Sequence, residues 1–365
     1  MKHPLDKNLR TQILVLPAKH GDSMIIKTFD NLANKFNIVI DGGPPGTFEE
    51  ILKKELKSIK LINIIILTHI DSDHIGGLIK FVKHASFNPE QVERYWFNSK
   101  NIKFITIGEN INSGQARTFE ELLIDKGNIK EKWTENIFVG SEPKMPDGIT
   151  IEIVSPSQNI LDKLFKKWPD LSDKYNKKLE DIAISSTKLS QIERGTLEKL
   201  ALADDTPNKS ICQDIFNSSS IGFILRTFDT SVLFLGDAHP YFLEKTLASK
   251  GYSKDNKLIV DFVKISHHGS KNNTTNKLLD MIDCDKFVIS TNGGNSFHTH
   301  PDRETIARII HHPERVKSKY NKKRTIYLNY PIAIIELKAG KFIHNTDMEY
   351  GNWKVIENTR VLENE

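Results

Sequence analysis

The stretch Thr68–Gly77, THIDSDHIGG, decides the fold because it directly follows the most apolar run of the chain. That run, LINIIILT (61–68), is apolar on both faces, which predicts a central strand covered on both sides. The pattern GGLIKFVKH (76–84) then predicts a helix. Between strand and helix stand two histidines and two aspartates within six residues, and such side chains are the ligands of a metal site.

Strand-like segments rich in Ile and Val precede and follow this stretch. In the first part of the chain the expected strands are 11–18, 23–29, 36–43, 92–97 and 149–156, and the expected helices are 47–57 and 113–126. From residue 218 the same rhythm returns with a hairpin whose turn is at Asp229 and Thr230. After it we expect helices near 240–250, 275–282 and 302–312, alternating with strands at 258–266 and 286–291.

The whole chain has the composition of a globular protein, with 365 residues, 27% charged residues and a net charge of +4. This mild charge does not by itself indicate a nucleic-acid partner. Its two cysteines, Cys212 and Cys284, form no CxxC motif and no disulfide framework. The N-terminal residues lack the apolar core of a signal peptide, and no run has the length of a membrane helix. We therefore expect a cytoplasmic protein without membrane segments.

Several motifs resemble those of the metallo-β-lactamase-fold hydrolases. HxDxDH (69–74) resembles their HxHxDH signature, with Asp71 in the place of the second histidine. Three further signatures occur in family order along the chain, namely Asp41 in IVIDGG, Asp237 in FLGD, and His267 and His268 in KISHHGS. The resemblance implies an α+β fold, the αββα four-layer sandwich. Its halves would be 1–156 and 206–345, separated by a polar helical insert (157–205) and followed by a C-terminal extension (346–365).

Three other motifs resemble one branch of that family, the hydrolase domain of ComEC-type DNA-uptake proteins. They are HGDSMIIK (20–27), NSSS (217–220) and FHTHP (297–301). This branch implies a nuclease-type or phosphodiesterase site. Because the chain lacks membrane segments, only the hydrolase module is carried over, with a role in nucleic-acid processing or in defence against foreign DNA.

The resemblance implies two metal positions that share Asp237. The first would use His69, Asp71 and Asp237, and the second would use Asp73, His74, Asp237 and one of the tandem histidines. His268 is favoured because other family members place a histidine directly before the glycine. His267 would then contact the substrate or orient a ligand. Spacing alone leaves open which of the two binds the metal.

One histidine of the wider family is missing here, since only His84 lies between His74 and His239. The ComEC-like branch has Asn or Ser in that region, which matches Asn217 and Ser220. With more oxygen donors, the preference shifts toward manganese or magnesium, while zinc and single-ion occupancy stay open. The residues expected to support the ligands are Asp22, Asp41, Asn217 and Ser220.

Catalytic roles follow from the same positions. Asp73 or Asp237 would steer the attacking water. His300 would protonate the leaving group or bind a phosphate oxygen, and His267 would contact the substrate.

A basic run, ERVKSKYNKKR (314–324), is the second feature that favours phosphodiester substrates. It could neutralise phosphates, with Tyr320 as a stacking partner, or it could be an ordinary solvated loop. The expected nucleic-acid contacts are Arg315, Lys317, Lys319, Lys322, Lys323 and Arg324. The insert at 157–205 could be a lid, a surface for a protein partner or a spacer.

These observations favour a metal-dependent phosphodiesterase, a nuclease acting on DNA or RNA. The first alternative is a small-molecule ester hydrolase of the same fold, acting on a phosphocholine-type ester or a cyclic nucleotide. The second is a scaffold or binding subunit with a vestigial metal site, because the family histidine is missing. The oligomeric state is left open.

Overall fold

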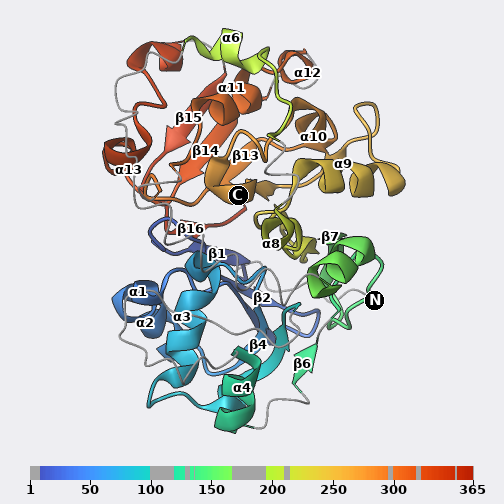
Figure 1. Ribbon diagram of the computed structural model, residues 1–365, viewed down its shortest axis with the longest axis vertical. Coiled ribbons are helices and arrows are strands. Elements are labelled where there is room, and N and C mark those ends of the chain that lie inside the picture. Colours follow the sequence, from blue (N-terminus) through green and yellow to red (C-terminus); the bar gives the residue numbers. More distant parts are fainter. Residues whose placement is uncertain are drawn as a thin grey trace.

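The computed structural model describes residues 9–98, 119–127, 132–134, 136–166, 195–208, 214–294, 299–317, 322–349 and 352–364. Two seven-stranded sheets pack face to face, and helices cover the outer face of each (Figure 1). This arrangement is the metallo-β-lactamase fold, and the expected αββα sandwich is confirmed. Among the described residues, no helix is long and apolar enough to cross a membrane.

The first sheet has the strand order β16-β1-β2-β3-β4-β5-β6. Strands β1 to β3 are antiparallel, whereas β3 to β6 are parallel. The strands are β1 (Gln12–Val15), β2 (Met24–Phe29), β3 (Lys35–Ile40), β4 (Ile62–Ile66), β5 (Val92–Trp96), β6 (Trp133–Thr134) and β16 (Val361–Leu362). The outer helices are α1 (Pro45–Thr47), the π-helix η1 (Phe48–Leu52), α2 (Lys53–Lys57), α3 (Ser72–Lys83) and α4 (Phe119–Gly127).

The second sheet has the order β15-β14-β13-β11-β9-β8-β7. Its strands are β7 (Thr150–Ser155), β8 (Gly222–Arg226), β9 (Ser231–Phe234), β11 (Phe262–Lys264), β13 (Lys286–Ile289), β14 (Arg324–Leu328) and β15 (Trp353–Ile356). Its helices are α6 (Leu197–Ala201), α8 (Ile215–Ser218), α9 (Pro240–Ser249), α10 (Asn276–Asp280), α11 (Arg303–His311), α12 (Pro313–Val316) and α13 (Ile332–Ala339). The shorter elements are β10 (Leu258–Ile259), β12 (Ile282–Asp283) and the 3₁₀-helices η2 (Pro89–Gln91), η5 (Ser266–Gly269) and η7 (Asn345–Glu349).

Strand β4 shows why the apolar run 61–68 becomes the centre of the first sheet. All its residues are buried, as expected for a strand that is covered on both faces. Ile64 and Ile66 pack in the apolar layer between the two sheets, and Ile65 packs with the residues of the outer helices. Successive side chains of a strand point to opposite faces, so a strand between two apolar layers is apolar on both, with Asn63 as the polar exception in β4.

The division of the chain differs in detail from the expected one. Residues 346–365 provide β15 to the second sheet and β16 to the first, so this segment completes both sheets. The expected strand 258–266 is divided into β10 and β11. The helix expected at 47–57 begins at Pro45 and contains a π-turn. Residues 113–118 of one expected helix and 167–194 of the insert lie outside the described residues.

Candidate metal centre

The candidate centre lies where strands of the two sheets end side by side. Strands β3 and β4 are parallel, as are β9, β11 and β13, so within each sheet their carboxyl ends meet at one edge. Asp41 follows β3, the segment 69–74 follows β4, Asp237 follows β9, and the tandem histidines follow β11. The order of strands therefore brings together side chains that are almost 200 residues apart in the sequence.

Four imidazoles surround one carboxylate oxygen, Oδ2 of Asp237. The Nε2 atoms lie 3.5 Å away in His74, 3.7 Å in His268, and 3.9 Å in both His69 and His267. These distances are too long for hydrogen bonds of ordinary strength. They are the separations expected of atoms that share an ion about 2 Å from each of them.

Hydrogen bonds at the opposite ring nitrogen fix which atom of each imidazole faces the centre. Nδ1–H of His268 donates to the carbonyl of Ser290 at 3.0 Å, and Nδ1–H of His74 donates to Asp41 at 2.8 Å. The Thr68 hydroxyl donates to Asp41, so it accepts from Nδ1–H of His69 at 3.1 Å. All three Nε2 atoms therefore direct a lone pair at the centre, which is the arrangement of metal-binding histidines.

The same atoms lack any other partner. Nε2 of His69, His74 and His268, and Oδ1 of Asp237, are buried without a hydrogen bond. Buried polar atoms are nearly always paired, so a cluster of lone pairs directed at one point is the donor arrangement of a cation site. Two sets have their ligand atoms within 4.8 Å of one another, namely His69, His74 and Asp237, and Asp73, His74 and His268. The donor set of imidazole and carboxylate fits a divalent metal.

The electrostatic field of the centre attracts positive charge. Burial opposes a charged His268, but Asp237 and Asp22 outweigh it and raise the pKa of His268 to about 10. Burial also works against ionisation of Asp237, yet the surrounding histidines hold the pKa of this carboxyl well below its usual range. Divalent ions would take the place of these protons.

The two aspartates of the opening motif occupy the rim. Oδ2 of Asp73 lies 3.5 Å from His268 Nε2, and Oδ2 of Asp71 lies 3.7 Å from His69 Nε2. Their side chains retain 21% and 23% exposure, whereas those of His69 and His74 have none. The rim is therefore the side of the centre from which water and substrate can approach.

The expected supporting residues differ in what they contact. Asp41 accepts from the amide and hydroxyl of Thr68 and from His74. The Ser220 hydroxyl accepts from the amide of Asp237 at 3.1 Å. Asp22 lies 3.5 Å from Nδ1 of His268 and pairs with the buried Lys264 at 2.6 Å. Asn217 instead donates to Asp214 at 3.0 Å.

The tandem histidines lie on strained backbone. His267 and His268 have φ values of 47° and 54°, a left-handed region that non-glycine residues rarely adopt. The loop is held by the Thr305 hydroxyl and the amide of Asp302, which both donate to the carbonyl of Gly269. Strain of this kind persists where the surroundings enforce it, as at functional sites.

His267 and His300 form a second layer beside the centre. Their rings lie edge to face with centroids 5.3 Å apart, and Nδ1 of His300 lies 3.4 Å from Asp302. Burial lowers the pKa of His267 to about 3, so this ring is neutral. The structure thus places His268 by its ring geometry among the metal-facing residues and His267 between the centre and His300.

Three residues of this region were missed in the sequence. Lys264 interrupts an apolar strand, and such a buried lysine requires a carboxylate partner, which is Asp22. Asp214 begins α8, and burial together with Asp71 raises its pKa to about 6. His20 is the first residue of HGDSMIIK (20–27), and its charge interactions include those with Asp73 and His268.

The basic run 314–324 is not the continuous phosphate-binding surface that we expected. Arg315 and Arg324 are only 4% and 2% exposed, and they donate to the carbonyls of Cys284 and Ile310. Their assignment as nucleic-acid contacts was wrong, because both guanidinium groups bind the protein interior. Lys317, Lys322 and Lys323 are exposed, whereas Lys319 and Tyr320 lie outside the described residues.

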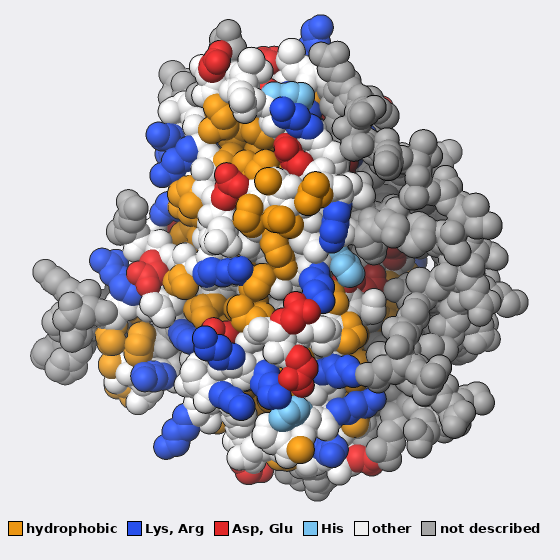
Figure 2. Space-filling model, turned by 90° about the vertical axis from the view of Figure 1, so that its left-hand side faces the viewer, with side chains coloured by type: hydrophobic (Ala, Val, Ile, Leu, Met, Phe, Trp, Pro, Cys, Tyr) orange, Lys and Arg blue, Asp and Glu red, His pale blue; other side chains and the backbone are white. Residues whose placement is uncertain are grey.

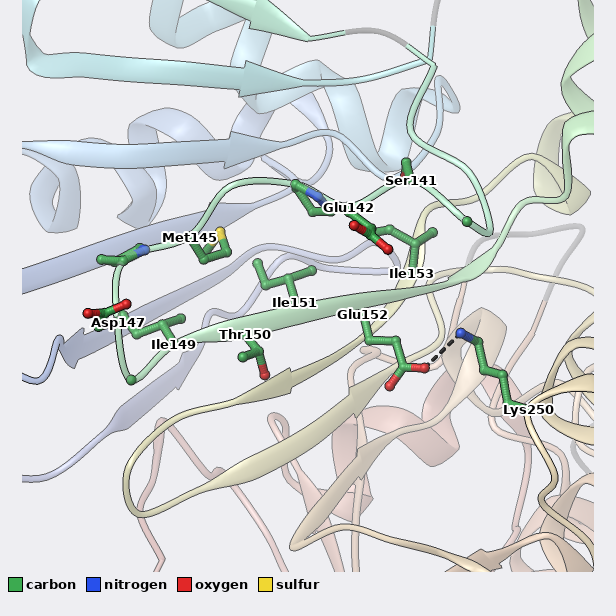
Figure 3. A pocket seen from close by; sticks show the side chains of 14 residues that line it. Ser141, Glu142, Met145, Asp147, Ile149, Thr150, Ile151, Glu152, Ile153 and Lys250 are labelled. Atoms are coloured by element: carbon green, nitrogen blue, oxygen red, sulfur yellow. Dashed lines mark ion pairs between the residues drawn. The ribbon is translucent and has the colours of Figure 1, made fainter.

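A separate hollow of about 540 Å³ lies between the loop 140–148 and β7 (Figure 3). One ion pair between its lining residues joins Glu152 and Lys250 at 2.7 Å, and the other lining residues are apolar, acidic or hydroxyl-bearing, with two glycines. None of its lining residues belongs to the metal centre.

Residues 18–146 match the family model of the Metallo-beta-lactamase superfamily. This part of the chain is therefore similar to that superfamily, and the His/Asp centre described above has side chains that could hold a metal ion. Members of this superfamily typically bind divalent metals. The match covers the part of the chain that carries Asp41 and the opening motif.

Three solved structures are similar to the chain. A long form of RNase Z from yeast has 13% sequence identity and a TM-score of 0.40, and the match covers 99% of this chain and 42% of that chain. A diphosphatase from the PhnP family has 12% identity and a TM-score of 0.40, with 98% of each chain covered. A mutant of CmlA beta-hydroxylase has 12% identity and a TM-score of 0.38, with 99% of this chain and 55% of that chain covered. The chain thus spans about half the length of the first and the third. No curated protein sequence gives a significant match.

Proposed function

We propose that the protein is a metal-dependent phosphodiesterase, a nuclease that hydrolyses DNA or RNA. The observation that carries this proposal is the convergence of three unpaired Nε2 atoms on Asp237 at the carboxyl ends of the strands. His69, Asp71 and Asp237 would hold one divalent ion, and Asp73, His74, Asp237 and His268 would hold a second. Manganese and zinc suit this donor set, and magnesium is the third candidate.

The residues around the reacting phosphorus have separate roles in the proposed reaction. When bound, the ions would lower the pKa of a water molecule and stabilise negative charge on the phosphoryl oxygens. Asp73, on the open rim, orients the attacking water and accepts its proton. The water oxygen bonds to phosphorus as the phosphorus–oxygen ester bond breaks. His300, held by Asp302, delivers a proton to the leaving oxygen, and neutral His267 contacts the phosphate.

The test is hydrolysis of labelled single- and double-stranded DNA and RNA with added manganese, magnesium or zinc. Cleavage that requires metal and disappears in the Asp73→Ala, His74→Ala double variant supports the proposal and identifies the preferred strand. The Asp261→Asn variant is the control, because Asp261 accepts from Ser231 on the other sheet. A folded and metal-loaded protein that cleaves none of the four polymers contradicts the proposal.

A second candidate follows from the burial of Arg315 and Arg324, which removes two expected phosphate contacts. The same centre would then hydrolyse a small phosphodiester, a phosphocholine-type ester or a cyclic nucleotide. Such a substrate needs few contacts beyond the centre. Reversing the charge of Lys322 and Lys323 would weaken polymer cleavage and its salt dependence but spare a small ester.

The ComEC-type relationship, a role in defence against foreign DNA and a protein partner at 157–205 belong to the same proposal. They rest on the HGDSMIIK, NSSS and FHTHP motifs and on the polar composition of the insert. The alternative of a scaffold with a vestigial centre predicts that purified protein neither contains nor gains metal. Measurement of metal content separates that alternative from both hydrolases.

A further inference from the structure

The turn 19–22 carries His20 over the edge of the metal centre. A Cβ added to Gly21 would lie 1.8 Å from the carbonyl oxygen of Asp73, so glycine alone permits this close approach. The Ser290 hydroxyl donates to the carbonyl of Gly21 at 3.2 Å. The turn is therefore fixed between the rim aspartate of the first half and the loop after β13 of the second.

The loop after β13 also contacts α13 and brings that helix close to the turn 19–22. The amide of Asn292 donates to the carbonyl of Lys19 at 2.7 Å. A Cβ added to the next residue, Gly293, would lie 2.3 Å from the carbonyl oxygen of Ile335 and 2.9 Å from Cβ of Lys338. The loop thus lies directly between the turn and α13, which brings Lys338 close to His20.

Two nitrogen-bearing side chains at this corner, those of His20 and Lys338, have no hydrogen-bond or ion-pair partner among the described residues. His20 is half-buried, and no described residue forms a hydrogen bond with it; Lys338 is exposed and forms no ion pair within the described chain. Burial lowers the pKa of His20 and Asp73 opposes this shift, while His268 and Lys338 are close enough to contribute to the lowering. By contrast, the neighbouring Lys19 pairs with Glu50 at 2.6 Å.

The surrounding surface has the same character. The face that carries α13, α1 and α2 presents more basic than acidic side chains, together with an apolar stripe (Figure 2). Exposed Leu337 and Ile334 lie on the same helix as Lys338. Such a basic surface raises the local concentration of anionic ligands near the centre.

We propose that His20 and Lys338 form an anion subsite that binds the phosphate adjacent to the scissile phosphodiester. The two side chains of the subsite are nitrogen donors, an imidazole and an ammonium, which suit a phosphate better than a metal cation or a sugar hydroxyl. It adjoins Asp73, where the reacting ester lies in the proposed function, on which this inference rests. The substrate class it favours is a phosphodiester with a second phosphate, as in a nucleotide strand or a terminally phosphorylated dinucleotide.

The first experiment compares dinucleotides of one sequence with and without a terminal phosphate, at either end, in manganese. For the wild type, we expect kcat/KM to be about tenfold higher with the phosphate, the typical effect of one exposed charged contact. In Lys338→Met and His20→Asn this preference should fall toward one, and Lys338→Arg should retain it. Lys341→Met, just beyond the same helix, is the matched control and should keep the preference.

The second experiment measures binding of inorganic phosphate to chelator-treated protein by calorimetry. We expect Lys338→Met and His20→Asn to weaken binding about fivefold or more, and Lys341→Met to leave it unchanged. An unchanged dinucleotide preference in both subsite variants, or no difference in phosphate binding, would overturn the subsite. If the wild type hydrolyses neither dinucleotide but phosphate binding responds to the variants, the proposed function fails and the subsite stands.

Discussion

Two segments of this chain, 69–74 and 314–324, are both rich in charged or ligand-type side chains, yet their side chains have different surroundings in the folded protein. In 69–74 the Nε2 atoms of both histidines face one buried point and lack a hydrogen-bond partner, and the two carboxylates lie at its rim. In 314–324 the two arginines turn inward and donate to backbone carbonyls, while the described lysines stay in solvent. Position relative to a buried strand explains the difference, because a strand end fixes the direction of the side chains that follow it.

The largest expected effect is the loss of hydrolysis on substitution of Asp237, the carboxylate that the histidines of 69–74 face. Asp237→Asn removes the carboxylate that all four imidazoles face, so both metal positions lose a ligand. Hydrolysis should fall by at least about a thousandfold, the scale on which members of one catalytic unit act. Metal content and rate are measured on the same preparation. Retention of both, in protein shown to be folded, would mean that Asp237 is not the central ligand.

The arginines of the second segment should act on stability. Arg324→Met leaves the carbonyls of Ile310 and Arg315 unpaired in the interior and should cost about 2–4 kcal/mol of unfolding free energy. Lys322→Met, two residues away and exposed, should stay within about 0.5 kcal/mol. Denaturant unfolding compares the two. If Arg324→Met is as mild as its control, the buried position of that arginine is incorrect.

The next smaller effect is a loss of metal affinity when the orientation of a ligand is disturbed. Asp41→Asn replaces the acceptor of His74 Nδ1–H and should lower metal affinity about 10–100-fold. Asp261→Asn is a matched control, because Asp261 also accepts from an amide and a hydroxyl of one neighbouring residue, Ser231. Competition with a metal-binding dye gives both affinities. Equal losses in the two variants would indicate general destabilisation.

A buried ion pair outside the centre should affect stability in acid and leave metal binding intact. Burial opposes the charge of Asp347, but its hydrogen bonds from Arg303 lower its pKa below 3.8. Because the folded-state pKa is the lower one, this contribution is present above pH 3.8 and is lost as the pH falls below it. Asp347→Asn should therefore show a shallower loss of stability between about pH 4 and 2, measured by thermal unfolding. An unchanged acid slope contradicts this.

The smallest expected effect concerns the exposed lysines of the basic run 314–324 and the salt dependence of cleavage. Lys322→Glu with Lys323→Glu should reduce the salt dependence of nucleic-acid cleavage by about two phosphate contacts in the logarithmic slope. Rates are measured across a series of salt concentrations. An unchanged slope would leave the described lysines of this segment without a role in substrate binding and would favour the small-ester substrate.

The fold and the clustering of histidine and aspartate side chains were predictable because they depend on local patterns. The apolar run 61–68 identifies a strand that is covered on both sides, and HxDxDH at its end identifies the ligand types. The inward turn of Arg324 could not be foreseen, since alternation places a residue on a face only once the neighbouring strand is known. Lys264 and His20 were missed for a similar reason, as each acquires its role from a residue in the other half of the chain.

The most direct test of the metal centre is the metal content of the purified wild-type protein and of the Asp237→Asn variant, before and after addition of manganese or zinc. The structure predicts one or two tightly bound ions per wild-type chain and their loss in the variant. A wild-type chain that is folded but holds less than about one tenth of an ion after metal addition would contradict it, because unpaired ligands in a preformed site bind metal strongly.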